Sequence, residues 1–303
     1  MQTAGGRKVK KHIAALCVLA AGILWGSMGV FVDLLGAFGF TTLQTAFLRI
    51  GSAAVLFVVF LLFKDKNLLR IGLRDVPVLF GLGIGCILAM TCVYFLAIRA
   101  TNYSTAAILL YTAPVMVSVM AAVFFKERFT RRKVIALAAA FIGCVLVSGL
   151  DPQSGVSPQG VLLGLLSGFA YAMYSILCKI ALRRLKPETV STYAFVFALF
   201  GALFACDVPG MAGHFSAAFA ASPVPLLLAV LGIGLVTAFL PFLLYSIGLS
   251  GLPAGKASIL ASVEPLVATL FGLLRGQGLR PEAALGIVCI LGAVVLLTTE
   301  KAD

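Results

Sequence analysis

A glutamate and a proline stand side by side within an apolar stretch near the end of the chain, ILASVEPLVATLF, residues 259–271. An acidic side chain at the centre of a membrane helix costs roughly 2.5–3.5 kcal/mol on insertion scales. Proline removes one helical hydrogen bond and clashes with the carbonyl four residues earlier. Glu264 therefore needs a charged partner, a water-filled cavity or a bound proton at that depth.

Arg49 is the candidate intramembrane charge partner of Glu264. Counted from the same membrane face, the two residues differ in depth by only ~3 Å at 1.5 Å per residue. A buried ion pair and a functional carboxylate are both consistent with this spacing, and they do not exclude each other. In the functional reading, Glu264 faces a cavity and orients the ammonium group of a substrate or carries a coupled proton.

Aromatic residues within apolar stretches are further candidates for substrate binding, because the polar tip of a buried Trp or Tyr needs a partner. The candidates are Trp25, Tyr94, Tyr111, Tyr171 and Tyr174. Tyrosines near the ends of such stretches are expected to be interface anchors instead, and these are Tyr103, Tyr193 and Tyr245.

The elements that hold these residues are predicted to be membrane-spanning helices. Of the 303 residues, 61% are hydrophobic and 11% are charged, whereas soluble domains contain about 25% charged residues. Apolar stretches of about 20 residues, the length that spans a bilayer, recur along the whole chain. We predict an all-α polytopic membrane protein with ten spans, at residues 13–35, 41–63, 76–98, 104–125, 133–149, 160–182, 188–207, 223–247, 253–274 and 281–299.

The net charge of +12 arises from Lys and Arg clusters between the spans, which argues against nucleic acid as a partner. With the N-terminus inside, 18 of the 23 basic residues fall in cytoplasmic segments and 3 in outer ones. The positive-inside rule therefore predicts that both termini are cytoplasmic. The first apolar run is longer than the 7–15 residues of a cleaved signal peptide, so it is predicted to remain as a helix.

The sequence gives little support for a metal site, a cofactor or an enzymatic activity. The seven cysteines contain no CxxC pair, so we expect no metal site, no disulfide and no cofactor. GLSG, residues 248–251, matches a G-x-S-G motif of intramembrane proteases, but His12 and His214 lie outside the spans. Activation of Ser250 needs an adjacent base, so a protease is a remote alternative and we do not expect an enzyme.

The two halves of the chain repeat each other. AILLYTAPV (107–115) aligns with SILASVEPL (258–266), which places Pro114 opposite Pro265, 151 residues apart. Five spans per half force the second half to insert upside down, as in many secondary transporters. Pro114 and Pro265 are therefore candidate hinges at a central cavity, although either alone could be a packing kink. Glycines at helical spacing, such as Gly22 with Gly26 and Gly164 with Gly168, predict close helix packing.

These stretches resemble the drug/metabolite transporter superfamily. LYTAPVMVSVMAAVFFKERFTRRKVIALAAAFIGCVLVSG is similar to the end of a first EamA domain, and ASVEPLVATLFGLLRGQGLRPEAALGIVCILGAVVLL to the end of a second. AGILWGS and FLRIGSAAVLF are similar to the first two helices. The resemblance implies a first repeat at 13–149 and a second at 160–299, joined by a periplasmic linker at 150–159, with cytoplasmic ends at 1–12 and 300–303.

The resemblance also implies transport of a small metabolite across a bacterial inner membrane through a central cavity, and the chain looks most like exporters of amino acids, including aromatic ones. A drug or nucleotide-sugar carrier is the alternative. The expected partners are a small-molecule substrate and the lipid bilayer; a monomer is expected and a dimer left open. One departure concerns the Gly-Glu pair that usually follows the fourth helix of each repeat. This chain has Lys126-Glu127 and Gly276-Gln277 there.

Overall fold

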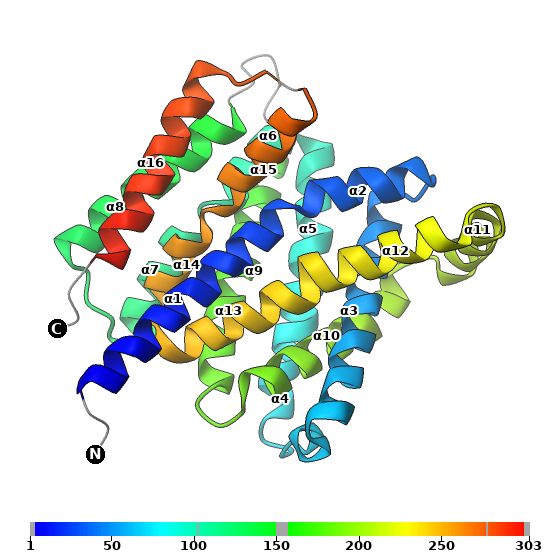
Figure 1. The fold of residues 1–303 in the computed structure, drawn as a ribbon, viewed down its shortest axis with the longest axis horizontal. Coiled ribbons are helices and arrows are strands. Elements are labelled where there is room, and N and C mark those ends of the chain that lie inside the picture. Colours follow the sequence, from blue (N-terminus) through cyan, green and yellow to red (C-terminus); the bar gives the residue numbers. More distant parts are fainter. Residues whose placement is uncertain (1–3, 102, 150–156, 277, 300–303) are drawn as a thin grey trace.

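The computed structural model describes residues 4–101, 103–149, 157–276 and 278–299, and their regular structure is entirely helical (Figure 1). The first half contains α1 (Ala4–Gly26), α2 (Met28–Ala37), α3 (Thr42–Lys64), the 3₁₀ helix η1 (Lys66–Leu69), α4 (Val76–Phe80), the π-helix η2 (Gly81–Leu88), α5 (Ala89–Ala100), α6 (Tyr103–Leu110), α7 (Ala113–Phe125) and α8 (Arg131–Ser148). The second half contains α9 (Pro158–Ala181), α10 (Pro187–Ala205), α11 (Val208–Ala221), α12 (Pro223–Gly234), the π-helix η3 (Leu235–Phe239), α13 (Leu240–Gly251), α14 (Ala254–Ala261), α15 (Glu264–Leu274) and α16 (Pro281–Thr298).

Nine helical runs in the described residues are long and apolar enough to cross a membrane. They coincide with nine of the ten predicted spans. The fifth span is α8, which begins with three basic residues and lies side by side with α16 (Figure 1). α11 was not predicted from the sequence; it projects from the bundle at the right of Figure 1.

Several spans are interrupted near their middle. The fourth span breaks between α6 and α7 just before Pro114, and the ninth breaks between α14 and α15 just before Pro265. Pro114 and Pro265 are the second residues of α7 and α15. Proline has no backbone N–H, and an N–H in the first turn of a helix has no intrahelical acceptor, so no hydrogen bond is lost there. The first span breaks at Ser27, between α1 and α2. The third span contains η2 and the eighth contains η3. When the two repeats are aligned at their 151-residue offset, the residues of η3 correspond to residues of η2.

Glycines bring the broken helices of one repeat against the first helix of the other. A Cβ atom on Gly22 of α1 would lie 2.9 Å from the Ala261 carbonyl oxygen, and one on Gly26 would lie 2.7 Å from that of Glu264. On α9, a Cβ atom on Gly168 would lie 3.0 Å from the Leu109 carbonyl oxygen. The predicted packing role of these glycines is confirmed, since only a missing side chain lets the backbones come this close.

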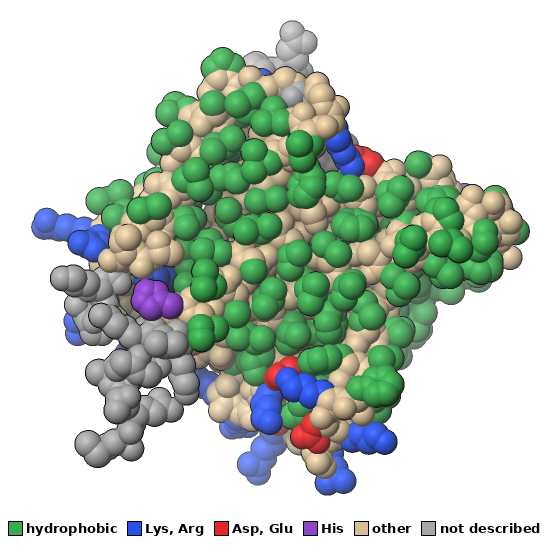
Figure 2. Space-filling model, in the orientation of Figure 1, with side chains coloured by type: hydrophobic (Ala, Val, Ile, Leu, Met, Phe, Trp, Pro, Cys, Tyr) green, Lys and Arg blue, Asp and Glu red, His purple; other side chains and the backbone are tan. Residues whose placement is uncertain are grey.

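The surface matches a protein surrounded by lipid. In Figure 2 apolar side chains cover the middle of the molecule, while Lys and Arg side chains gather towards its lower and left edges. The basic side chains described there come from the ends of α3, α8 and α9 and from the turns that follow α3 and α7. This end of the molecule is called the basic end below, and the other is called the opposite end.

Candidate functional site

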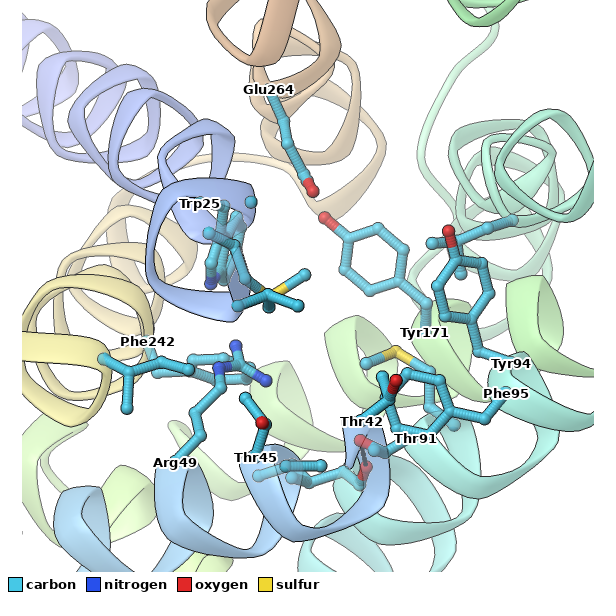
Figure 3. A pocket seen from close by; sticks show the side chains of 18 of the residues that line it. Trp25, Thr42, Thr45, Arg49, Thr91, Tyr94, Phe95, Tyr171, Phe242 and Glu264 are labelled. Carbon is cyan, nitrogen blue, oxygen red and sulfur yellow. Dashed lines mark hydrogen bonds between the residues drawn. The ribbon is translucent and has the colours of Figure 1, made fainter. Parts of the chain in front are cut away.

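A cavity of about 370 Å³ lies between the two repeats. Its lining comes from α1, α2, α3, η2, α5, α9, α12, α13 and α15, and from Leu110 at the end of α6. Figure 3 shows Glu264 reaching in from one side and Arg49 from the other, with Trp25, Tyr94 and Tyr171 between them. Asp33 and Thr42, near the opposite end of the molecule, also line it, so the cavity extends towards that end.

Glu264 is the first residue of α15, and its side chain lines the cavity. The break before Pro265 creates a new helix start at this depth, and the N-terminus of a helix favours a negative charge. The side chain is half-buried and points towards the ring of Tyr171 in Figure 3. The neighbouring proline thus supplies the helix end at which a carboxylate can be tolerated.

Arg49 projects from α3 and is held by a single residue of η3. Its Nη2 donates to the carbonyl oxygen of Thr237 at 2.8 Å, and its Nε donates to the Thr237 hydroxyl at 3.1 Å. That hydroxyl donates in turn to the carbonyl of Ile233 at 2.6 Å. The guanidinium carbon also lies 5.8 Å from the ring centre of Phe242, within the range of a cation–π contact.

Arg49 and Glu264 share the cavity but do not form a direct ion pair among the described residues. The similar depth expected from residue counting therefore does not produce contact in this structure. The residues lie on opposite sides of the cavity (Figure 3). Arg49 is bound to Thr237 instead. The space between the two charges is open to a ligand.

The structure brings together four of the five predicted aromatic residues. Trp25, Tyr94, Tyr171 and Tyr174 line the cavity. The Trp25 ring lies 6.4 Å from that of Tyr171 and 5.2 Å from that of Phe242, both edge-on. Tyr111 does not line the cavity; it lies at the break between α6 and α7 and packs beside a small core cluster that includes Cys144 and Val263.

Tyr245 is not the interface anchor that its position near the end of a span indicated. It is fully buried, bonded to the Ser175 hydroxyl at 2.9 Å and 5.3 Å from the Trp25 ring. Tyr193, by contrast, reaches a helix end and donates to the Leu69 carbonyl. The side chain of Tyr103 lies outside the described residues.

Several lining residues were missed because their types are common in membrane helices. They are Met28, Gly29, Val32, Thr42, Thr45, Ala46, Cys86, Ile87, Met90, Thr91, Phe95, Leu110, Ile233 and Phe242. Thr45 carried a usable signal, because a residue four positions before Arg49 lies on the same helix face. Asp33, an acidic residue near the end of the first span, was not a predicted site residue either; it lines the cavity and pairs with Arg275.

Polar contacts close the basic end of the molecule, and those of Glu127 with the start of α14 join the two repeats. Glu127 accepts hydrogen bonds from the backbone N–H groups of Ala254 at 2.6 Å and Gly255 at 3.2 Å, at the start of α14. Lys133, almost fully buried, donates to Glu127 at 3.1 Å. Lys179 donates to the carbonyls of Leu249 and Leu252 at the end of α13. Together these contacts join α7, α8 and α9 to α13 and α14.

Ser250 lies at the end of α13, where its hydroxyl is exposed and donates to the carbonyl of Ile247 three residues earlier. Of the two histidines, His214 lies on α11 and bonds to the carbonyl of Phe38. His12 lies near the start of α1. Among the described residues, no hydrogen bond joins either histidine to Ser250.

The model of the EamA-like transporter family matches residues 12–149 and 158–299, almost the whole chain. The chain belongs to the EamA-like transporter family. The predicted fold class, ten helices in two inverted five-helix repeats, is confirmed by this match together with the helical structure. Family members are membrane transporters, so this chain is a membrane transporter too.

Relatives of this EamA protein are similar over nearly their whole length. An uncharacterized transporter of Archaeoglobus fulgidus is 31% identical over 94% of this chain and 96% of its own. The uncharacterized transporter YwfM of Bacillus subtilis is 27% identical over 97% and 96%. The uncharacterized inner membrane transporter YicL of Salmonella typhimurium is 26% identical over 94% and 95%. A solved crystal structure with 20% identity shares the fold, with a TM-score of 0.78 over 94% of this chain and 96% of that one.

Proposed function

We propose that this EamA protein is a secondary transporter of amino acids, including aromatic ones. The observation that carries the proposal is the cavity with a carboxylate on one side, a guanidinium on the other and aromatic rings between them. An amino acid presents an ammonium group to Glu264, a carboxylate to Arg49 and an apolar side chain to the aromatic wall. The cavity volume of about 370 Å³ lies within the range of about 300–1,000 Å³ that is usual for small-molecule sites.

The alternative, a carrier of nucleotide sugars, fits the lining less well. Phosphate groups are bound by several charge-assisted hydrogen bonds, usually from Arg and Lys. Among the described residues that line the cavity, Arg49 is the one basic side chain, and Asp33 and Glu264 are acidic. A drug carrier would share the aromatic wall, so the transport panel below includes a cationic dye.

We further propose alternating access, with the present structure open on the outer side. The cavity extends to Asp33 and Thr42 at the opposite end, while Glu127, Lys133 and Lys179 close the basic end. The positive-inside rule favours a cytoplasmic basic end, with both termini on that side. The location that we propose is a bacterial inner membrane.

Transport by purified protein in liposomes tests the proposal. The panel contains labelled phenylalanine, tyrosine, leucine, glutamate and lysine, together with UDP-glucose and ethidium, each with and without a pH gradient. We expect saturable uptake of phenylalanine, tyrosine and leucine above that of empty liposomes. Uptake of UDP-glucose or ethidium, with none of any amino acid, would contradict the amino-acid assignment, and the effect of the gradient would show whether protons are coupled.

A further inference from the structure

Arg49 lies where a carbonyl group has lost its usual helical donor. In an α-helix the carbonyl of Thr237 would accept a hydrogen bond from the N–H of residue 241, which is Pro241 and has none. Instead, Arg49 of α3 donates a hydrogen bond from Nη2 to this carbonyl oxygen at 2.8 Å. The proline therefore leaves an acceptor at membrane depth that a charged side chain of α3 occupies.

The local helix geometry accommodates this exchange. Thr237 lies at the centre of η3, where Leu240 donates its N–H to Leu235, five residues back rather than four. The wider turn of a π-helix is frequently found at functional sites. The Thr237 hydroxyl adds a second acceptor for Arg49 and is itself oriented by its bond to Ile233. Two N–H groups of the guanidinium are thus fixed by one residue.

Neutral groups hold Arg49, so its positive charge is not cancelled by a carboxylate in direct contact. Its known partners are the carbonyl and hydroxyl of Thr237 and the ring of Phe242, and among described residues it forms no ion pair. The side chain lines the cavity and points into it in Figure 3. A half-buried guanidinium of this kind provides a strong site for an anion, especially a planar carboxylate.

Thr45 lies one helical turn before Arg49 on the same face of α3 and also lines the cavity. The residue is 3% exposed, and its hydroxyl oxygen has no hydrogen-bond partner among the described residues. Buried hydroxyl groups are usually paired. This hydroxyl is an available donor beside the guanidinium, and a bound carboxylate would satisfy it.

We propose that Arg49 and Thr45 form the subsite that binds the carboxylate of the transported amino acid, and that Pro241 is a positioning residue for it. Pro241 acts through the Thr237 carbonyl, which fixes the guanidinium with its free N–H groups towards the cavity. This assignment rests on the proposed function and goes further. It places the substrate carboxylate at Arg49 and Thr45, and it makes binding of the carboxylate independent of binding of the ammonium group.

Binding measured by the fluorescence of Trp25 tests the subsite without transport. Trp25 is the only tryptophan of the chain and lines the cavity, so its emission in detergent reports ligand entry. Three ligands share one aromatic ring: phenylalanine, 3-phenylpropionate with the carboxylate alone, and phenethylamine with the ammonium alone. Pro241→Ala restores an N–H that competes for the Thr237 carbonyl. We expect it to raise the Kd of phenylalanine and 3-phenylpropionate about tenfold, the effect of one charged hydrogen bond, and to leave phenethylamine within twofold.

The double variant with Arg49→Gln separates positioning from a general structural effect. If Pro241 acts through Arg49, Pro241→Ala will not change the Kd of 3-phenylpropionate further when Arg49 is already Gln. An equal loss for all three ligands, or an unchanged Kd for the two carboxylates, would show that Pro241 is only a structural residue. Pro223→Ala, at the exposed start of α12 and outside the cavity lining, is the control and is expected to bind all three ligands like the unaltered protein.

Two milder variants keep the test decisive if Pro241→Ala does not fold. Thr45→Val preserves shape but removes the hydroxyl, and Arg49→Lys preserves charge but removes the planar fork; both should weaken 3-phenylpropionate selectively, and an unchanged Kd in both would overturn the subsite. Failure of the unaltered protein to bind either carboxylate would overturn it as well. Binding of 3-phenylpropionate with no amino-acid uptake in liposomes would instead leave the subsite in place and reject the proposed function.

Discussion

At the scale of single residues, the pairing of Glu264 with Pro265 has a physical explanation. Pro265 interrupts the ninth span, and the interruption makes Glu264 the first residue of a new helix. Free N–H groups in the first turn of α15 favour a carboxylate there, typically by 0.3–1 kcal/mol. A residue that is costly in a continuous membrane helix is thus less costly at the break, and its side chain faces the cavity.

Replacing Glu264 by Gln should remove the proposed ammonium site and preserve the shape of the cavity. We expect the apparent kcat/KM for phenylalanine uptake to fall at least tenfold at each pH between 5 and 8, because a charged hydrogen bond is worth about 1.5–3 kcal/mol. Initial uptake rates in liposomes measure this. Glu282→Gln, at an exposed position at the start of α16, is the matched control and should transport normally. Unchanged uptake by Glu264→Gln would remove the carboxylate from the mechanism.

Lys126 is the described non-glycine residue with a positive φ, at 56°, where α7 ends. Gly276, which follows α15 at the corresponding position of the second repeat, has a φ of 81°. The departure from a Gly-Glu pair therefore places a lysine in a left-handed conformation that favours glycine. The next residue, Glu127, accepts a hydrogen bond from the backbone N–H at the start of α14.

Lys126→Gly should therefore stabilise the protein. Glycine relieves a left-handed backbone strain of about 1–2 kcal/mol. This gain is larger than the cost of about 0.5–1 kcal/mol that comes from the extra backbone entropy of glycine in the unfolded chain. Thermal unfolding in detergent would show a higher Tm. Val123→Gly, three residues earlier inside α7, is the control, and it should lower the Tm because its backbone is helical. A lower Tm for Lys126→Gly would mean that the lysine side chain contributes more than the strain costs.

Sequence reasoning identified the charged and aromatic residues of the cavity more readily than its other members. Glu264, Arg49 and Trp25 stand out because their types are unusual in an apolar helix, and all three line the cavity. Thr237 is an ordinary residue for such a helix, and its contact with Arg49 depends on how two helices cross. The same holds for Tyr111, whose position three residues before Pro114 does not reveal which way its side chain points.

At the scale of helices, α8 and α16 form a pair whose contact depends on glycine. A Cβ atom on Gly143 would lie 2.7 Å from the carbonyl oxygen of Gly286 and 2.7 Å from Cγ1 of Ile290. Further along the repeats, AFIGCVLVSG (140–149) aligns with CILGAVVLLT (289–298) at an offset of 149 residues, which places Gly292 opposite Gly143. Gly292 is exposed with no neighbour within 4 Å. Equivalent positions in the two repeats thus differ, because the two helices pack against each other at only one of them.

Alanine at these two glycines should give opposite results. Gly143→Ala forces α8 and α16 apart and should cost about 1–3 kcal/mol, the usual effect of overpacking. Gly292→Ala meets no atoms and should be neutral or stabilise by up to about 1 kcal/mol through helix propensity. The Tm of each variant in detergent measures the difference. Equal Tm values would show that α8 and α16 can separate without loss.

Spans were predicted well because the length of an apolar stretch can be read directly from the sequence. Predicted limits lie within a few residues of a helix end except the start of the first span, predicted at 13 where α1 begins at Ala4. The breaks were only partly predicted. Proline marks those before Pro114 and Pro265, and Pro241 follows η3, whereas η2 and the turn at Ser27 carry no such mark. Their positions follow from tertiary contacts, which local patterns do not record.

At the scale of the whole molecule, the two ends are closed to different extents. At the basic end, Glu127 of the first repeat accepts two partly buried hydrogen bonds from the start of α14 in the second, Lys133 pairs with Glu127, and Lys179 ties α9 to α13 within the second repeat. At the opposite end, Asp33 and Arg275 form a partly exposed ion pair beside the cavity. Exposed pairs contribute only about 0–1 kcal/mol, so the opposite end is held by weaker polar contacts than the basic end.

Thiol labelling in intact cells tests which end opens outwards. In a background with the seven native cysteines replaced, Thr42→Cys should react with a membrane-impermeant maleimide in intact cells, because Thr42 lines the cavity at the opposite end. Phenylalanine in excess should slow the reaction. Lys126→Cys, after α7 at the basic end, should react only after permeabilisation. The reverse pattern would place the basic end outside and overturn the proposed orientation.

The π-helix η3 makes the binding site depend on the length of its span as well as on its side chains. A π-helical turn takes in one residue more than an α-helical turn, so the helix on either side of it keeps its faces. Deleting one residue between Leu235 and Phe239 would return the segment to ordinary α-helical winding, and Phe242 and Tyr245 would still face Trp25, which they contact. The deletion would instead displace the Thr237 carbonyl and hydroxyl from the Arg49 guanidinium that they hold. Relatives that lack this extra residue would need another support for the arginine, so an insertion or deletion here is a mark by which substrate preference could be traced through the family.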